Sequence, residues 1–393
     1  VQAKFPKVLR GWILIAAMVL ASGWIGASRV AAGGGGTVYV MNSGDESVTV
    51  LDGINHIPLD RVGVSSGPTA AAFSVDGHDV WVANQESGQL LVIDRGTQTV
   101  VRGMSIGGSP NALVFGPDGQ VLYVTDSAND LLIVIDADKA EVEDRISVGD
   151  RPVAIALSPD ATHVAVANNG SNSVTIVDRK SLLPRAEISV GEGPQALVFG
   201  EDNNTLFVTV SHGVVVVDVQ HKQATHVWRP CERPHQVSMM PGFQQLYVVC
   251  SSTNQVVIID ATTGQLLKQV EVGHGPTGIT LSEDLQWVYV TNTADHTVSV
   301  LNTTKHEVES VAVVGQNPTG IVAGAPSDMA IQFESDLPPV KELQRIGIAP
   351  IAGTASNLGA KIVVAATLVL TPVGFGIERL RRRRNRRLQK LNP

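Results

Sequence analysis

Residues 287–302 read WVYVTNTADHTVSVLN. This stretch contains two short runs rich in β-branched residues, 287–291 and 297–301, separated by a polar segment. β-Branched and aromatic residues favour extended strands, whereas Gly, Pro, Asp and Asn favour the turns between them. Two further runs, 277–281 and 308–314, flank this pair and complete a unit of four predicted strands.

The same unit occurs seven times along the chain. Its Tyr-Val-type dipeptide begins at Tyr39, Trp81, Tyr123, Ala165, Phe207, Tyr247 and Tyr289, so every spacing is 42 residues except one of 40. A proline keeps the same step at Pro68, Pro110, Pro152, Pro194, Pro234, Pro276 and Pro318. A polar residue closes another run at Asp52, Asp94, Asp136, Asp178, Asp218, Asp260 and Asn302. Three registers that stay in step over seven copies establish an internal repeat.

Four strands in about 40 residues make one blade of a β-propeller, and seven blades close into a ring. We therefore predict an all-β, seven-bladed propeller over residues 37–323. The repeat begins on the second strand of a blade, near residues 37–41, and ends on a first strand, near 319–323. The first blade should then combine three N-terminal strands with one C-terminal strand, which ties the ends of the ring together.

Tyr-Val-Thr-Asn at 289–292, Val-Ser-Val-Leu-Asn at 298–302 and Gly-x-x-Pro-type turns between copies resemble the YVTN-type seven-bladed β-propeller repeat proteins. Binding proteins, surface proteins and several enzymes share this repeat, so the resemblance implies a fold and no single activity. Similar propellers hold modified haem in periplasmic nitrite reductases and copper in nitrous oxide reductase. The haem- and copper-binding residues of those families cannot be matched here residue by residue, so no cofactor is carried over from them.

The composition excludes several other classes of protein. Charged residues make up only 17% of the 393 residues, which is too apolar for a disordered chain, and 38 glycines and 20 prolines argue against a coiled coil. The two cysteines form no CxxC or CxxCH motif, which excludes a zinc ribbon and a c-type haem. Residues 30–360 carry 16 basic and 36 acidic groups, a net charge of -20 that disfavours nucleic-acid binding.

An apolar segment follows basic residues at the N-terminal end. Gly11–Ser28 has no charged residue and follows Lys4, Lys7 and Arg10, a pattern that fits a secretory signal peptide or an uncleaved signal anchor. The length of the run favours the anchor. We therefore expect residues 1–36 to contain a basic cytoplasmic start and a transmembrane helix.

A second apolar segment lies near the other end. Leu358–Ile377 is long enough to span a bilayer if Lys361 reaches the interface. The tail that follows, 378–393, is basic and includes Arg381, Arg382, Arg383, Arg384, Arg386 and Arg387. A basic cluster directly after an apolar span is typical of the cytoplasmic side. We therefore expect a cell-membrane protein, in a bacterium an inner-membrane one, with both termini in the cytoplasm and the propeller on the periplasmic side.

The connections at the two ends also predict how the ring is oriented. Residues 29–36 reach less than roughly 30 Å even when extended. The strands of each blade are called A to D from the ring axis outward. We expect the face that carries the A–B and C–D loops to lie toward the membrane. The opposite face, with the B–C loops and the D–A connections, would be open to a partner, and residues 324–357 are a linker without repeat character.

One inter-blade connection departs from the repeat. Six connections contain small or polar residues before the proline, whereas residues 228–235 read WRPCERPH. His235 stands where the other copies have Thr, Asn, Val or Gln, and the two-residue deletion falls in the neighbouring loop around His212. The predicted threading places these residues in one sector of the outward face: His212, Arg229, Cys231, Arg233, His235 and Cys250.

Three interpretations of this sector remain open. Histidine titrates near neutrality and arginine binds carboxylates, so His212, Arg229, Arg233 and His235 are candidates for a binding or catalytic site. Cys231 and Cys250 are candidates for a disulfide in an oxidising compartment, because Cys250 should pair near Pro234. The sector can also be purely structural. We expect no metal site, since Met239 and Met240 lie too far along the strand to join His235 in binding copper.

The favoured function is that of a non-catalytic scaffold or accessory subunit of a membrane protein complex. The expected partners are integral membrane proteins, membrane lipid and a basic soluble protein on the acidic outer surface, with no nucleic acid and no cofactor. No catalytic residue is assigned. One alternative is a periplasmic propeller enzyme or electron-transfer-linked oxidoreductase. Another is a module that binds a small ligand or a cell-wall polymer at the ring mouth.

Overall fold

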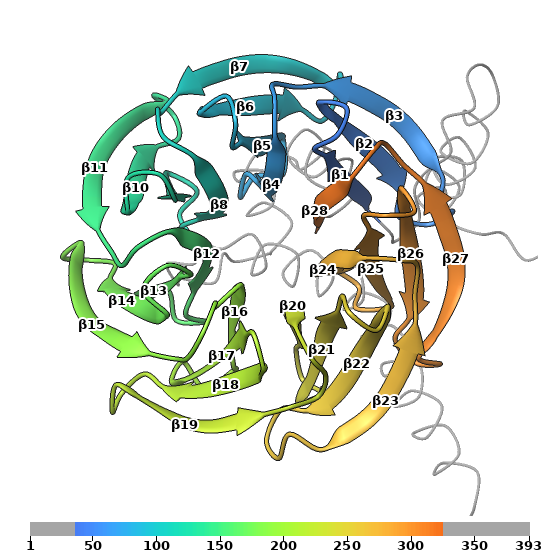
Figure 1. Ribbon diagram of the computed structural model, residues 1–393. Helices are drawn as coiled ribbons and strands as arrows, with labels where there is room; N and C mark the ends of the chain where they lie inside the picture. The colour runs from blue at the N-terminus through green and yellow to red at the C-terminus, as the bar shows by residue number, and fades with distance from the viewer. Residues whose placement is uncertain (1–35, 325–393) are drawn as a thin grey trace, which may run out of the picture. The chain divides into compact units, whose positions relative to one another are not determined.

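The computed structural model describes residues 36–324, which form 28 β-strands in seven four-stranded sheets arranged around a central axis (Figure 1). The strands of every sheet are antiparallel to their neighbours. Each sheet is one blade. The predicted all-β, seven-bladed propeller with four-stranded blades is therefore confirmed.

Each blade contributes one strand to each of four concentric positions. The innermost A strands are β4 (Pro68–Phe73), β8 (Pro110–Phe115), β12 (Pro152–Leu157), β16 (Ala196–Phe199), β20 (Pro234–Met240), β24 (Pro276–Leu281) and β28 (Pro318–Gly324). The B strands are β1 (Thr37–Asn42), β5 (Asp79–Asn84), β9 (Val121–Asp126), β13 (His163–Asn168), β17 (Thr205–Val210), β21 (Gln245–Cys250) and β25 (Trp287–Asn292). The C strands are β2 (Ser47–Asp52), β6 (Gln89–Asp94), β10 (Leu131–Asp136), β14 (Ser173–Asp178), β18 (Gly213–Asp218), β22 (Gln255–Asp260) and β26 (Thr297–Asn302). The outermost D strands are β3 (Pro58–Gly63), β7 (Thr99–Ser105), β11 (Glu141–Ser147), β15 (Leu183–Ser189), β19 (Gln223–Trp228), β23 (Leu266–Glu271) and β27 (Glu307–Val313).

The hydrophobic core lies between neighbouring blades. B strands are buried on both faces because each blade packs against two others, so β21 has five consecutive buried residues. The aromatic residue of the repeat fills this space, and Tyr39, Trp81 and Tyr247 are at most 1% exposed. D strands face solvent on their outer side, and β23 buries only Val270. The repeated aromatic and β-branched positions therefore form the contacts that hold one blade against the next.

The ring closes by pairing the two ends of the repeat region. Blade 1 consists of β28, β1, β2 and β3, and β28 lies antiparallel to β1 with Val40 opposite Ile321. Three strands thus come from the N-terminal side and one from the C-terminal side. Blades 2 to 7 follow in chain order, from β4–β7 to β24–β27. The closing strand begins at Pro318 and ends at Gly324, one residue beyond the predicted range at each end.

Both ends of the described chain leave the ring on the same face. Thr37 pairs with Gly324 at the end of the β1–β28 ladder. Gly36 accepts a hydrogen bond from the backbone N–H of Gly53, 3.0 Å away, in the C–D turn of blade 1. The face that carries the A–B loops and C–D turns is therefore where residue 36 enters and residue 324 leaves.

The predicted membrane segments, linker and basic tail lie outside the described residues. These are the segments at 11–28 and 358–377 with their basic flanks, together with the linker. Within residues 36–324 no helix is long and apolar enough to cross a membrane.

Candidate functional site

The B–C loop of blade 5 is shorter than the corresponding loop of the other six blades. In those six, the last loop residue has a positive φ and its carbonyl accepts an N–H from the residue after strand D. The donor–acceptor pairs are Val64–Glu46, Ile106–Gly88, Val148–Asp130, Val190–Asn172, Val272–Asn254 and Val314–His296. In blade 5 only Ser211 and His212 separate β17 from β18. The six donors each lie four residues before the repeat proline, and in blade 5 that position is Pro230, which has no N–H. The deletion and the proline thus remove both partners of one repeated hydrogen bond.

A disulfide between Cys231 and Cys250 attaches this connection to strand B of the next blade. The two Cα atoms lie 6.2 Å apart, and the residues are 19 positions apart in the chain. Other blades have a glycine and an asparagine in these two positions, namely Gly149–Asn168, Gly273–Asn292 and Gly315–Asn42. A Cβ on any of these glycines would lie within 2.7 Å of the asparagine side chain. The cysteine pair therefore places a covalent bond where the repeat already brings two chain segments into contact.

His235 links two neighbouring A strands at the ring mouth. Its Nδ1 donates to the carbonyl oxygen of Thr277 in blade 7, 3.0 Å away, and its own carbonyl accepts from the Thr209 hydroxyl of blade 5. A carbonyl only accepts, so Nδ1 carries the proton. Burial lowers the pKa of His235 by more than the bond to Thr277 raises it, which keeps the imidazole neutral at pH 7.

The same inter-blade link recurs at this position of the repeat with other side chains. The Thr69 hydroxyl donates to the Asn111 carbonyl at 3.2 Å, and the Thr319 hydroxyl donates to the Pro68 carbonyl at 3.3 Å. His235 therefore has a structural role that threonine fills elsewhere. Its Nε2 has no hydrogen-bond partner among residues 36–324 and keeps a lone pair for a ligand.

The other candidates of this sector are exposed side chains on the rim. His212 Nε2 lies 3.9 Å from Glu192 Oε2, and both side chains are 76% exposed, so this pair contributes little to stability. Arg229 and Arg233 are exposed and form no ion pair within the part of the chain that the structure describes. The Arg233 N–H donates to the Ser211 carbonyl at 3.3 Å, which joins the connection to the shortened loop. All six residues thus lie in one sector, and their role in binding stays a prediction.

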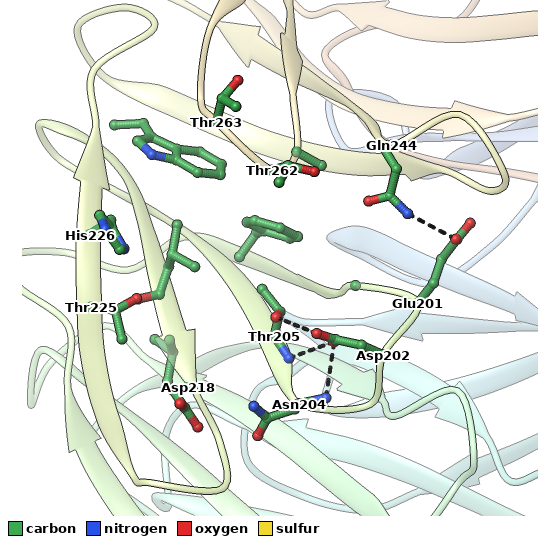
Figure 2. A pocket seen from close by; sticks show the side chains of 16 residues that line it. Glu201, Asp202, Asn204, Thr205, Asp218, Thr225, His226, Gln244, Thr262 and Thr263 are labelled. Carbon is green, nitrogen blue, oxygen red and sulfur yellow. Dashed lines mark hydrogen bonds between the residues drawn. The ribbon is translucent and has the colours of Figure 1, made fainter.

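A cavity of about 680 Å³ lies between blades 5 and 6, and the predicted site residues do not line it. Its walls come from the A–B loop of blade 5, strands β17, β18 and β19, and the C–D turn of blade 6. Figure 2 shows Glu201 and Asp202 on one side of the cavity and Thr225 and His226 of β19 on the other. The cavity thus opens between loops of the face on which the described chain begins and ends.

The cavity is acidic. Glu201, Asp202 and Asp218 line it, and no lysine or arginine does. Burial tends to raise the pKa of Asp202, but hydrogen bonds from the Thr205 hydroxyl and N–H and from the Asn204 N–H outweigh it and lower the pKa. The N–H and ring of His221 hold the pKa of Asp218 below its usual value. Both aspartates are therefore ionised at neutral pH and favour a cationic ligand.

Aromatic rings form the apolar wall of the cavity. The rings of Phe207 and Trp228 lie 5.6 Å apart between centroids. Trp228 ends β19, where the other blades have the aliphatic residues Val62, Met104, Ile146, Ile188, Val270 and Ala312. A Cβ on Gly264 would lie 2.5 Å from the indole ring, so the ring occupies space that only a glycine leaves. Comparing the seven copies position by position at Trp228 and Gly264 could have revealed this feature from sequence.

Within residues 36–324 no three His, Cys, Asp or Glu side chains are grouped so that they could hold a metal ion. Asp202 and Asp218 are instead held by hydrogen bonds of their own loops, whereas Glu201 accepts hydrogen bonds from Gly242 and Gln244 of blade 6.

Comparison with known proteins identifies the fold. A family profile described as "YNCE-like beta-propeller" matches residues 14–327. A search of curated proteins gives no significant match. Among solved structures, Kuenenia stuttgartiensis hydrazine synthase is 20% identical with a TM-score of 0.60, covering 67% of this chain and 94% of that one. A functionally unknown protein from Desulfotomaculum acetoxidans is 16% identical with a TM-score of 0.65, covering 74% and 99%.

The dihydro-heme d1 dehydrogenase NirN in complex with DHE is also similar. It is 16% identical with a TM-score of 0.61, and the match covers 77% of this chain and 78% of that one. At these levels of identity the likeness to all three structures concerns the fold.

Proposed function

The chain belongs to the YNCE-like β-propeller family, and from that premise we propose that it is a non-catalytic scaffold or accessory subunit of a membrane protein complex. The observation that carries the proposal is the closure of the ring. Because Thr37 pairs with Gly324, the chain before β1 and the chain after β28 continue from neighbouring positions at one end of blade 1. The chain segments that lead to the two predicted apolar segments therefore leave the ring at the same place, which suits a rigid ring held close to a bilayer.

In this proposal residues 11–28 and 358–377 span the membrane, and the propeller lies on the periplasmic side of an inner membrane. The basic residues before the first segment and after the second would remain in the cytoplasm. The partners are integral membrane proteins of the complex, which the two helices and the adjacent face of the ring contact. A basic soluble protein is a further partner for the acidic outer surface.

The structural roles of the candidate reactive groups support an interaction protein. Cys231 and Cys250 are joined to each other, and His235 Nδ1 bonds the neighbouring blade. These residues hold the connection between blades 5 and 6 in place. Rigid blades that present exposed loops are well suited to binding another protein.

A second candidate function is the binding of a small ligand or cell-wall polymer at the ring mouth. Two observations favour it. His235 Nε2 has no hydrogen-bond partner within residues 36–324, and the guanidinium groups of Arg229 and Arg233 are exposed. Such groups bind carboxylates and phosphates. The enzyme alternative rests on the names of hydrazine synthase and NirN, whose likeness to this chain concerns the fold.

Purification of the tagged full-length chain in a mild detergent tests the proposal. Mass spectrometry of the eluate should find a constant set of integral membrane proteins at fixed stoichiometry. A chain that elutes alone, or that carries its own visible chromophore or metal, would contradict the scaffold function. The His235→Ala and Arg233→Ala variants should retain the partners, whereas ligand binding at the mouth predicts that they lose a ligand-induced thermal shift.

A further inference from the structure

The C–D turns of blades 2 and 4 place an arginine in the cleft toward the preceding blade. Arg95 is 5% exposed, and it donates to the Gly77 carbonyl at 2.5 Å and to the Thr37 hydroxyl of blade 1 at 2.8 Å. Its guanidinium lies 4.8 Å from the centroid of the Phe73 ring. Arg95 thus combines hydrogen bonds with an aromatic contact inside a cleft between two blades.

Arg179 occupies the same position in blade 4. Its Nη1 donates to Asp118 Oδ2 of blade 3 at 3.3 Å, and its Nε donates to the Ala161 carbonyl at 2.8 Å. A guanidinium therefore fills two clefts of this propeller, bonded in one to a threonine and in the other to an aspartate of the preceding blade.

Blade 6 has Ala261 at this position, while its neighbour keeps the acceptors. By the period of the repeat, Thr205 of blade 5 corresponds to Thr37, and Asp202 corresponds to Asp118. Asp202, Thr205 and Ala261 all line the cavity between blades 5 and 6. Gly264 replaces the larger Gln98 and Leu182 of the two arginine-containing turns, and the indole ring of Trp228 occupies the space beside it. The cavity thus lies where blade 6, like four other blades, has no guanidinium and where blade 5 retains groups that can bind one.

We propose that this cavity binds the guanidinium group of an arginine from a partner protein. The inference rests on the proposed scaffold function and names the chemistry of one contact. Asp202 and Asp218 supply ionised acceptors, and Trp228 supplies an aromatic surface on which a planar cation can stack. Arginine fits this set better than lysine because its planar, fork-shaped group donates in several directions and stacks on rings.

The place of the cavity matches a partner in the membrane. Asp202 belongs to an A–B loop and Ala261 to a C–D turn, and these loops lie on the face where the described chain begins and ends. The sequence predicts that this face lies toward the bilayer. An arginine in a periplasmic loop of an integral membrane protein would approach the cavity from that side.

Titration of the full-length chain in detergent with acetyl-Gly-Arg-Gly-amide tests the binding chemistry. We expect saturable binding by calorimetry or ligand-observed NMR, with the Lys peptide at least about tenfold weaker. The Asp202→Asn variant should bind the Arg peptide about tenfold more weakly, because one charge-assisted bond is lost. The Ala261→Arg variant should lose binding, since it supplies the guanidinium that blades 2 and 4 carry.

Matched variants separate the cavity from general attraction to an acidic protein. Asp118→Asn removes the same charge from the cleft that Arg179 already fills, and Thr304→Arg adds the same charge to an exposed turn of blade 7. Both should bind the peptide like the unchanged protein, and thermal unfolding should show that every variant is folded. No binding, equal binding of the Arg and Lys peptides, or undiminished binding by Ala261→Arg would each overturn the proposal.

Two further measurements identify the source of the arginine. Replacing Arg381–Arg384 by glutamine should leave the affinity unchanged, and a gain would assign the cavity to the chain's own tail. Co-purified membrane proteins should be lost from Ala261→Arg and kept by Thr304→Arg. If Ala261→Arg keeps them, the assignment to a partner fails while the scaffold function stands. If the unchanged protein retains none, the scaffold function itself fails, and the peptide titration still decides whether the cavity is a guanidinium site.

Discussion

At the scale of single residues, the seven copies serve as references for one another. His235 occupies a position where Thr69 and Thr319 form the same kind of link to the next blade. The histidine adds a titratable group that those threonines lack. Its pKa is lowered by burial, so the folded protein binds a proton at lower pH than the unfolded chain does.

This difference predicts a pH dependence of stability. The free energy of unfolding should fall as the pH drops below about 6.5, the ordinary pKa of histidine, because the unfolded chain then gains a proton that the folded protein resists. His235→Asn retains a donor and has a precedent at Asn111 in blade 3, so it should reduce this slope. Urea unfolding at pH 7.5, 6.5 and 5.5 measures it. Burial also lowers the pKa of His56 and His306, so part of the slope should remain; identical slopes in variant and parent would contradict the role of His235.

The contact between Gly264 and Trp228 makes a second prediction at this scale. Gly264 has a φ of +72°, and an added Cβ would lie 2.5 Å from the indole. Gly242 has a φ of +76° with nothing within 4 Å of an added Cβ. Gly264→Ala should therefore lose about 1–3 kcal/mol more stability than Gly242→Ala, because only the former also displaces a packed ring. Equal losses in chemical unfolding would show that the indole moves away without cost.

At the scale of elements, the connection between β19 and β20 is the exceptional part of the ring. Pro230 and the short loop at 211–212 remove a backbone hydrogen bond that the other six blades form. The disulfide attaches the connection to β21 of the next blade, while the Arg233 N–H still bonds the Ser211 carbonyl in the loop of its own blade. One covalent bond therefore joins blade 6 to the connection that leaves blade 5.

Removing this bond should destabilise the protein measurably. Cys231→Gly with Cys250→Val copies the pair of residues that blade 5 has at these two positions of the repeat, Gly191 and Val210. The neighbouring C strand is the same in both blades at the third position, which is Val215 in blade 5 and Val257 in blade 6. The double variant should lose roughly 3 kcal/mol, as expected for a closed loop of this length. Denaturant unfolding with and without dithiothreitol measures the difference. The reductant should lower the free energy of unfolding of the parent protein and leave that of the double variant unchanged. If the reductant does not change the stability of the parent, the disulfide is not stabilising.

At the scale of the whole molecule, stability depends on closing the ring. β28 covers the edge of β1, and Ile321 and Ala323 pack against the cluster that contains Val38 and Val40. Without β28, blade 1 would have three strands and an open edge next to β4. Such an edge exposes unpaired backbone groups and apolar surface.

Two truncated chains isolate this contribution. A chain that ends at residue 327 keeps β28, and one that ends at residue 317 lacks it, while both lack the predicted C-terminal membrane segment. We expect the shorter chain to unfold at least about 10 °C lower and to associate through its open edge. Circular dichroism and light scattering measure both properties. Equal, cooperative unfolding of the two chains would show that the ring does not depend on its closing strand.

The sequence by itself determined the all-β class and the number of blades, because six blades are local units whose four strands follow one another along the chain. It also determined the ring closure, because the repeat begins on a second strand and ends on a first strand, which together complete the remaining blade. Position-by-position comparison of the copies also singled out His235 and the two cysteines. The cavity was missed because it depends on a side chain that is absent, Ala261 where Arg95 and Arg179 stand elsewhere, and on an acceptor, Asp202, in a different blade. Only the packing of one blade against the next decided that these positions face one another, since no local pattern of apolar and polar residues records which side chains meet across a cleft.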